Sequence, residues 1–323
     1  MLCVLLRLKI DEMINRELIR YKAVQLFYAY RVSGGKTANE AEKEFTVSLE
    51  RAHDLYLYLL TLLTYIRRYA ERLAENIEAR NERRGLKLPT SSAERTLADN
   101  KWLLTLADNE ELSAYREKNQ DINDEEEALI KRLTHLFIEN EDFLLYIKKG
   151  DLSPEADQEI VRRLYKTIIT TCEDIESVLE TRSLYWNDDK AVIDTFVLKT
   201  IKRLRPYGNA AQPLLSAWGD EQDRDFAMRL FRATIDGQEE AQELIERYSS
   251  DRWDNSRIPL MDIVILHTAL AELMGVPGIP ASVTINEYIN VAKWYSTPQS
   301  PSFINALLDT IAKHLREEGR LMK

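Results

Sequence analysis

The run V-T-I-N-E-Y-I-N-V-A-K-W-Y, Val283 to Tyr295, decides the fold of this chain. Thr284 and Glu287 stand in the T-x-x-E spacing of a capping box, in which each side chain satisfies a backbone donor at a helix start. Apolar residues then recur at helical spacing and form one face, made by Ile285, Tyr288, Ile289 and Ala292. The run therefore predicts an amphipathic helix that packs through this face.

Two further helices are expected on either side of this run. Residues 258–274 are apolar around much of the helix circumference, which predicts a largely buried central helix. Downstream, Ser302 stands where it can cap a helix whose apolar face is Phe303, Ile304, Leu307, Leu308, Ile311 and Leu315. The three helices together predict a small hydrophobic core.

The rest of the chain is also expected to be helical. Only ten Gly and nine Pro occur in 323 residues, which favours helices over a turn-rich β architecture. A first helix is predicted from about Ile14 to Val32, ended by Ser33-Gly34-Gly35, and a capping box at Thr37 and Glu40 opens a long helix to about Arg80. Further helical segments are predicted at 93–118, 124–147, 154–180 and 188–203.

The expected organisation is an N-terminal helical part, a linker and a C-terminal helical part. Residues 1–12 are an extension or a misassigned start, with Met13 as the hypothetical natural start. Residues 13–205 form the N-terminal subdomain with a large insertion, and 206–221 form the linker, which opens with Pro206-Tyr207-Gly208. Residues 222–318 form the C-terminal subdomain, and 319–323 form a tail.

Composition narrows the class of protein. No apolar run reaches the roughly 18 residues that a membrane span needs, and the two cysteines, Cys3 and Cys172, make no disulfide framework. We therefore expect a cytoplasmic protein that does not bind membranes. The formal net charge is −10, so any nucleic-acid site must be a local basic patch or be completed by a basic partner.

The sequence does not predict an enzyme. The four histidines are scattered, and Glu50 to His53 gives a single E-x-x-H where a di-iron bundle needs two. Phosphate-binding, dinucleotide-binding and nucleophile-elbow glycine motifs are all missing from the sequence. We expect no catalytic residue, no metal site and no cofactor.

Four motifs in the C-terminal third carry a family resemblance. They are D-x-V-I-L-H-x-A-L-A-E-L from Asp262, I-P from Ile279, the run quoted above, and F-I-N-A-L-L-D-T-I-A from Phe303. The stretch R-E-L-I-R-Y-K-A-V-Q-L-F-Y-A-Y from Arg16 adds a fifth. In this order and spacing they resemble the NusB family of bacterial transcription antitermination factors. The resemblance implies an all-α, NusB-like helical bundle of two subdomains, whose N-terminal subdomain is enlarged because about 38–205 matches nothing in the family.

The resemblance also implies partners and site residues. NusB proteins pair with NusE, a small-subunit ribosomal protein, and the pair binds boxA-type RNA on the RNA polymerase elongation complex, chiefly in ribosomal RNA transcription. The expected RNA-binding positions are Arg16, Arg20, Lys22, Tyr28, Asp262, His267 and Phe303. Most of them match family motifs, whereas Lys22 adds a charge beside the matching arginines and His267 stands where the family commonly has arginine. Arg16, Arg20 and Lys22 would contact phosphates, which position RNA without reading its sequence. The loop Gln299–Ser302 would lie beside them.

Structural roles for the same residues stay open at this point. Tyr28 and Phe303 can stack on bases or pack in the core. Asp262 can accept a hydrogen bond from a base or complement the start of a helix. NusE contacts are expected only in the general region 225–248 and in the turn 254–262.

Two alternatives to antitermination remain. The first is a helical protein-interaction scaffold that keeps the fold but has lost RNA recognition, which the acidic total and the reduced number of arginines favour. The second is an enzymatic relation, because NusB-like domains also occur fused to ribosomal RNA methyltransferases. The second is disfavoured because nothing in the chain resembles a nucleotide-cofactor fold.

Overall fold

The computed structural model describes residues 12–86, 92–249 and 258–321. Regular structure in these ranges is almost entirely helical, which confirms the all-α class. Two three-residue strands, β1 (Glu12–Ile14) and β2 (Ser216–Trp218), pair with each other. Nearly all of the expected extension at 1–12, and the last two residues of the expected tail, lie outside the described residues.

Contacts divide the chain into two compact units. Unit one contains residues 1–50 and 217–323, and unit two contains residues 51–216. The sequence-based division instead placed residues 13–205 together. The difference arises because the first helix packs against helices of the C-terminal segment, as described below.

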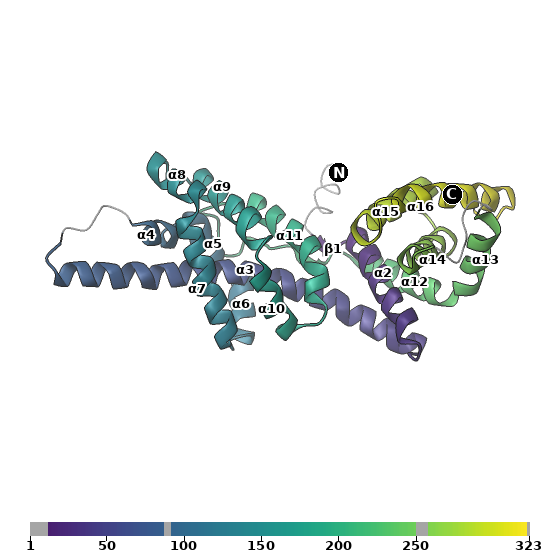
Figure 1. Ribbon diagram of the computed structural model, residues 1–323, viewed down its shortest axis with the longest axis horizontal. Coiled ribbons are helices and arrows are strands. Elements are labelled where there is room, and N and C mark those ends of the chain that lie inside the picture. Colours follow the sequence, from purple (N-terminus) through teal and green to yellow (C-terminus); the bar gives the residue numbers. More distant parts are fainter. Residues whose placement is uncertain (1–11, 87–91, 250–257, 322–323) are drawn as a thin grey trace. The chain divides into compact units, whose positions relative to one another are not determined.

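Unit one is built around a single buried helix. Its elements are α2 (Arg16–Ser33), the start of α3 (Ala38–Arg83), α12 (Glu221–Asp236), α13 (Gln238–Tyr248), α14 (Leu260–Gly275), α15 (Ala281–Tyr295) and α16 (Ser300–Glu317). Helix α14 contacts α2, α12, α13, α15 and α16, and Figure 1 shows it surrounded by them. Val264, Ile265 and Leu270 are fully buried, which confirms the predicted central helix.

The ends of the first two helices follow their local sequence. The Asn15 side chain accepts a hydrogen bond from Leu18 N at 3.0 Å, and Gly34 ends α2 with a φ of 62° that glycine adopts without strain. The capping box at the start of α3 is confirmed. Thr37 N donates to Glu40 Oε2 at 2.8 Å, and Glu40 N donates to Thr37 Oγ1 at 3.3 Å.

Two other predicted caps are wrong. Helix α15 begins at Ala281, so Thr284 lies inside it and donates its hydroxyl proton to Glu272 Oε1 at 2.9 Å. Helix α16 begins at Ser300, which places Ser302 in its first turn rather than before it. In both helices a proline near the start, Pro280 or Pro301, fits a first turn because no helical partner exists there for an N–H.

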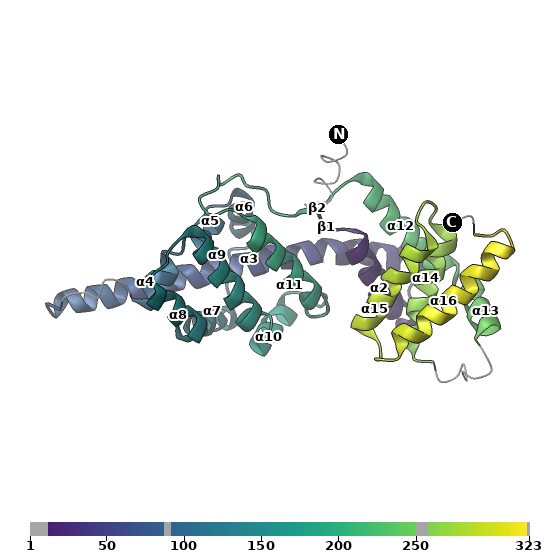
Figure 2. The same ribbon diagram turned by 90° about the horizontal axis from the view of Figure 1, so that it is seen from above.

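Unit two groups short helices along the part of α3 that follows Arg51 (Figure 2). They are α4 (Ala93–Ala98), α5 (Lys101–Ala107), α6 (Glu110–Lys118), α7 (Asp124–Glu139), α8 (Glu141–Lys149), α9 (Pro154–Leu164), the π-helical turn η1 (Tyr165–Ile169), α10 (Glu173–Arg182) and α11 (Trp186–Arg203).

Asparagines explain why the predicted long segments are broken. The side chains of Asn100, Asn109 and Asn140 each accept a hydrogen bond from a backbone N–H at the start of the next helix. An asparagine that caps a new helix offers the backbone an alternative to continuing the old one. The segment predicted at 93–118 is therefore three helices, and 124–147 is two.

Buried charges in unit two are paired. The Tyr165 hydroxyl donates to Asp194 Oδ1 at 2.6 Å, and Lys190 Nζ lies 2.8 Å from Asp194 Oδ2. Lys190 also donates to the carbonyl oxygens of Ile169 at 3.1 Å and Thr170 at 3.4 Å, at the end of η1. Burial and the neighbouring Asp194 carboxylate raise the pKa of Tyr165 well above its ordinary value. This cluster satisfies the groups that the irregular turn leaves unpaired.

The described helices include none whose length and apolar character would let it span a bilayer.

The buried cap Asn109 gives a test of this fold. Its side chain accepts from Leu112 N at 3.2 Å and donates to the carbonyl oxygens of Ala210 at 3.3 Å and Gln212 at 2.8 Å. We expect Asn109→Ala to lower the stability of unit two by about 2–3 kcal/mol, because a cap is lost and carbonyls lose a donor. The exposed Asn119→Ala should change stability by less than about 0.5 kcal/mol. Thermal unfolding of both variants measures this, and equal effects would contradict it.

Candidate nucleic-acid interface

Arg16 opens helix α2 and reaches the surface of unit one. Its side chain is 38% exposed, and its Nε lies 3.1 Å from Asp223 Oδ1. The guanidinium also lies 5.2 Å from the centre of the Phe226 ring. Arg16 lines a pocket with Arg229 and the turn from Val276 to Ile279. Its guanidinium is thus partly engaged inside the protein and partly open to solvent.

Arg20, one turn further along α2, is a buried structural residue. It makes two hydrogen bonds of 2.8 Å to the carboxylate of Glu272, which is itself fully buried. Glu287 lies 3.5 Å from its third nitrogen. Burial alone would lower the pKa of Arg20, but hydrogen bonding and the charge of Glu272 raise it above the ordinary value. The expected phosphate contact is not met, because this side chain is only 5% exposed.

The Glu272 carboxylate accepts further hydrogen bonds from α15. Thr284 Oγ1 lies 2.9 Å from Oε1, and the Tyr288 hydroxyl lies 3.2 Å from Oε2. Burial, and then the charge of Glu272, raises the pKa of Tyr288 well above its ordinary value. The three helices α2, α14 and α15 therefore meet at one ionic cluster, made by Arg20, Glu272, Thr284, Tyr288 and Glu287.

Three more predicted site residues are also buried. Lys22, Asp262 and His267 are 1%, 3% and 2% exposed, so their side chains do not face solvent as the sequence led us to expect. The Asp262 carboxylate accepts a hydrogen bond from Ser300 Oγ at 2.7 Å and another from Ser296 Oγ. Asp262 thereby anchors the start of α16, which places the following Phe303.

His267 is a neutral core histidine. Its Nε2 lies 3.1 Å from Gln242 Oε1, and its ring centre lies 5.9 Å from that of Phe27. Burial, with a smaller contribution from the positive charge of Arg31, lowers its pKa to about 4. The ring is therefore uncharged at neutral pH and adds no positive charge to an RNA surface.

An aromatic surface, defined here as Tyr28, Trp294 and Tyr295, remains accessible on unit one. Tyr28 is 36% exposed and Trp294 is 55% exposed. Gln25 Nε2 donates to the Tyr295 hydroxyl at 3.0 Å, and Tyr21 lies 5.8 Å from the Tyr295 ring centre, so α15 is held beside α2 here. Flat, solvent-accessible rings are the groups on which unpaired bases stack.

Sequence reasoning missed Trp294 and Tyr295 as candidates. The signal was available, because Trp294 lies off the apolar face set by Ile285, Tyr288 and Ala292. A tryptophan on the polar side of an amphipathic helix has no core to fill, so its exposure is informative.

Phe303 lines a separate hollow on unit one. Its side chain is half-buried in the first turn of α16. The hollow is lined by Tyr248, Ser249, Pro298, Gln299, Ser302, Phe303, Ala306, Leu307 and Thr310. Tyr248 in turn stacks on His314, with ring centres 4.6 Å apart. The expected loop 299–302 is thus part of this hollow, although Ser300 to Ser302 are already helical.

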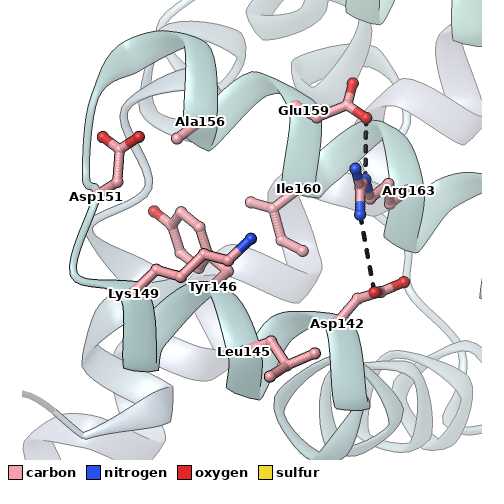
Figure 3. A pocket seen from close by; sticks show the side chains of 9 residues that line it. All are labelled: Asp142, Leu145, Tyr146, Lys149, Asp151, Ala156, Glu159, Ile160 and Arg163. Carbon is pink, nitrogen blue, oxygen red and sulfur yellow. Dashed lines mark hydrogen bonds and ion pairs between the residues drawn. The ribbon is translucent and has the colours of Figure 1, made fainter.

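A pocket in unit two is lined mainly by residues of α8 and α9 (Figure 3). The Tyr146 hydroxyl donates to the buried Asp157 at 2.5 Å. Arg163 lies 2.9 Å from Glu159 and 3.8 Å from Asp142. Arg163 is thus a cation shared by these two carboxylates. Across the described ranges, no three His, Cys, Asp or Glu side chains gather so as to hold a metal ion.

Comparison with known proteins identifies a family for the C-terminal part of the chain. Residues 198–313 match the family model described as NusB family. The transcription antitermination protein NusB of Geotalea daltonii is 35% identical over 140 residues, which cover 43% of this chain and 93% of that protein. The chain belongs to the NusB family. The NusB protein of Salinibacter ruber is 42% identical over 104 residues, which are 32% of this chain and 64% of the relative.

Among solved structures, NusB of T. maritima shares 31% sequence identity with this chain. The match covers 36% of this chain and 72% of the T. maritima chain, with a TM-score of 0.27. The Geotalea daltonii match spans 93% of that relative but only 43% of this chain, so this NusB-family chain is much longer than that relative. The region expected to contact a partner, 225–248, forms most of α12 and all of α13, and residues 254–257 of the expected turn lie outside the described residues.

The buried ion pair predicts a large mutational effect at Arg20. We expect Arg20→Met to cost about 3–5 kcal/mol of stability, because it leaves the Glu272 carboxylate buried without a counter-charge. Arg16→Met, at the half-exposed pair with Asp223, should cost less than about 1 kcal/mol. Urea unfolding of both variants tests the difference. Recovery of stability in the double variant Arg20→Met, Glu272→Met would identify the stranded charge as the cause.

His267 predicts a loss of stability at acidic pH. Its ordinary pKa is 6.5 and its pKa in the folded protein is about 4. The unfolded chain therefore binds the proton more readily, so a stability contribution that is complete above pH 6.5 is lost as the pH falls towards 4. The full contribution is about 3 kcal/mol.

Thermal unfolding between pH 7 and pH 4 measures this contribution. The variant His267→Gln should lose less stability than the wild type over this range, whereas the exposed control His314→Gln should follow the wild type. Parallel curves for wild type and His267→Gln would contradict the assignment.

Proposed function

We propose that this protein is a transcription antitermination factor that binds boxA-type RNA together with NusE. It acts without turnover or cofactor, in the cytoplasm, by bringing RNA and NusE to the elongating RNA polymerase, chiefly during ribosomal RNA transcription. The NusB-family match and the curated names of the relatives support the antitermination role. The observation that carries the RNA-binding part is the accessible aromatic surface made by Tyr28, Trp294 and Tyr295.

In this proposal the predicted residues have two kinds of role, direct contact with RNA and support of the fold from inside. Arg16, Tyr28 and Phe303 reach the surface and contact RNA directly. Arg20 and Asp262 act from inside, since Arg20 holds α2 against α14 and Asp262 holds the turn before Phe303. Lys22 and His267 belong to the same interior. RNA is thus recognised more by stacking than by charge.

In this proposal NusE supplies the exposed positive charge that α2 of unit one largely lacks. A chain with a net charge of −10 repels an RNA backbone, and few of the family-type cations of α2 face solvent. A basic ribosomal protein bound beside the aromatic surface offsets this repulsion and provides phosphate contacts. Tethering the strand at two adjacent surfaces raises its effective concentration at each of them.

The burial of several predicted RNA-binding residues favours a second function. Four of the predicted RNA-binding residues are buried, namely Arg20, Lys22, Asp262 and His267. If this burial has removed RNA recognition, the protein is a helical scaffold that binds protein partners alone. The two functions differ in one measurable property, the gain in complex stability that RNA brings to the pair with NusE.

Binding of labelled boxA-type RNA decides between them. Fluorescence anisotropy is measured with the full chain, with and without NusE, and with a scrambled RNA as the sequence control. Tyr28→Ala and Trp294→Ala should each weaken the ternary complex by about 5- to 100-fold, as expected for the loss of one stacked base. Val283→Ala, exposed on the same helix α15, is the matched control and should leave affinity unchanged.

The outcomes separate the two proposals. Tighter binding of boxA-type RNA than of scrambled RNA in the presence of NusE supports antitermination. If RNA adds nothing to a complex that still forms between this chain and NusE, the scaffold remains and the RNA function is excluded.

A further inference from the structure

The segment Arg205-Pro206-Tyr207-Gly208, expected from the sequence to be a linker, is a firmly held turn of unit two. Arg205 N donates to Gln212 Oε1 and Gln212 Nε2 donates to Arg205 O, both at 3.0 Å. Tyr207 N donates to Thr105 Oγ1 on α5 at 3.1 Å. Beneath the turn, Trp102 Nε1 donates to Leu204 O at 3.1 Å. Hydrogen bonds with the side chains of Gln212, Thr105 and Trp102 therefore hold the turn and its flanking residue in place. This set of hydrogen bonds is called the clamp below.

Gly208 is required by this clamp. A Cβ atom at this position would stand 1.5 Å from Gln212 Nε2, which is the atom that donates to Arg205 O. Further along, Asn109 and Glu110 N hold the carbonyl oxygen of Ala210, at 3.3 Å and 3.1 Å. A segment that only joined two parts of a chain would not need this many specific contacts.

Tyr207 is presented to solvent by a strained backbone. Its φ is 59°, in the left-handed region that bulky side chains rarely adopt, and it is alone among the described non-glycine residues in having a positive φ. Its side chain is 64% exposed, so the ring fills no core that would explain the strain. Strain of this kind, held by surrounding contacts, is characteristic of functional positions.

One cation lies close to this ring, and others are near it in the sequence. Lys101 Nζ lies 5.5 Å from the centre of the Tyr207 ring and donates to Leu152 O at 2.6 Å. The 25 residues from Thr195 to Gly219 contain no Asp or Glu, and their cations are Lys199, Lys202, Arg203 and Arg205. Lys202 and Arg205 are exposed, while Arg203 is half-buried and donates to Pro213 O at 2.6 Å.

Two nearby carboxylates accept hydrogen bonds within the protein, whereas Glu110, whose N–H donates to Ala210 O, is exposed. The Asp157 carboxylate, close to Lys101, is buried and accepts hydrogen bonds from Lys101 N at 2.7 Å and Tyr146 Oη at 2.5 Å. Glu111 accepts from Leu214 N at 3.2 Å, at the far end of the loop. The residues Lys101, Lys202, Arg205 and Tyr207, named here the Tyr207 surface, combine three cations with one exposed ring in an acidic chain.

We propose that the Tyr207 surface binds single-stranded RNA. Lys202 and Arg205 contact phosphates, and a base stacks on the exposed ring of Tyr207. This inference rests on the proposed function only in taking RNA as the ligand, since it concerns a different unit of the chain. An acidic protein segment would match the charge, but it would not explain why a flat ring is held outward against backbone strain.

RNA length provides the test, in the full chain with NusE present. A short boxA-type RNA is compared with a long RNA that adds about 20 nucleotides of unrelated sequence on each side, enough to fill a second single-strand site. We expect the long RNA to bind more tightly than the short one. Lys202→Ala with Arg205→Ala should remove this gain and reduce the slope of log affinity against log salt by about 1.4.

Tyr207→Gly separates binding from folding. Glycine adopts a positive φ without strain, so the variant should unfold at the same or a higher temperature than the wild type. It should nevertheless weaken binding of the long RNA about tenfold, because the stacking ring is gone. Lys131→Ala with Arg132→Ala, two exposed cations on α7, is the matched control and should keep the gain.

Each outcome has a distinct meaning. If short RNA binds and long RNA gains nothing, or if the gain survives in both Tyr207-surface variants, the inference is overturned while the proposed function stands. If only the long RNA binds and the variants abolish it, the inference stands and the boxA proposal falls. If neither RNA binds, both fall, and binding of poly-glutamate that the same variants abolish would assign the surface to an acidic protein.

Discussion

The buried ion pair between Arg20 and Glu272 is the constraint on which unit one depends. It joins residues 252 positions apart, and through Thr284 and Tyr288 it fixes α15 against the same carboxylate. A carboxylate without solvent is tolerated only with a counter-charge and satisfied lone pairs, so these residues must be present together. The first helix of the chain is consequently part of the C-terminal fold.

The dependence on partners distant in the sequence explains which parts of the fold were predictable from the sequence. Apolar periodicity located α14 and the face of α15, because burial of a stripe is encoded locally. The helix starts were predicted less accurately, since two of the predicted caps are wrong. The same T-x-x-E spacing is a capping box at Thr37, where solvent surrounds it, and a tertiary contact at Thr284, where Glu272 competes for the hydroxyl. Only the distant partner distinguishes the two, and local pattern does not contain it.

Prediction of the candidate site from the sequence was limited in the same way, because the burial of a side chain depends on residues distant in the sequence. Arg16 and Arg20 are one helical turn apart, and both lie near the Phe226 ring, at 5.2 and 5.3 Å. The sequence could show that they share a face, but not that this face meets a buried glutamate. The family resemblance drew attention to α2, α14 and α16. It did not indicate that four of the seven chosen side chains point inward, nor that Trp294 points outward.

Whole-chain charge does not locate the cations of this protein. The charge of −10 is a sum over distances much greater than the roughly 8–10 Å over which salt lets charges act. In unit one, Arg20 and Lys22 are buried, whereas the aromatic side chains of Tyr28 and Trp294 are exposed. In unit two, the acid-free stretch 195–219 keeps Lys202 and Arg205 at the surface. The two proposed RNA contacts therefore draw on different exposed groups, aromatic side chains on unit one and a ring with nearby cations on unit two.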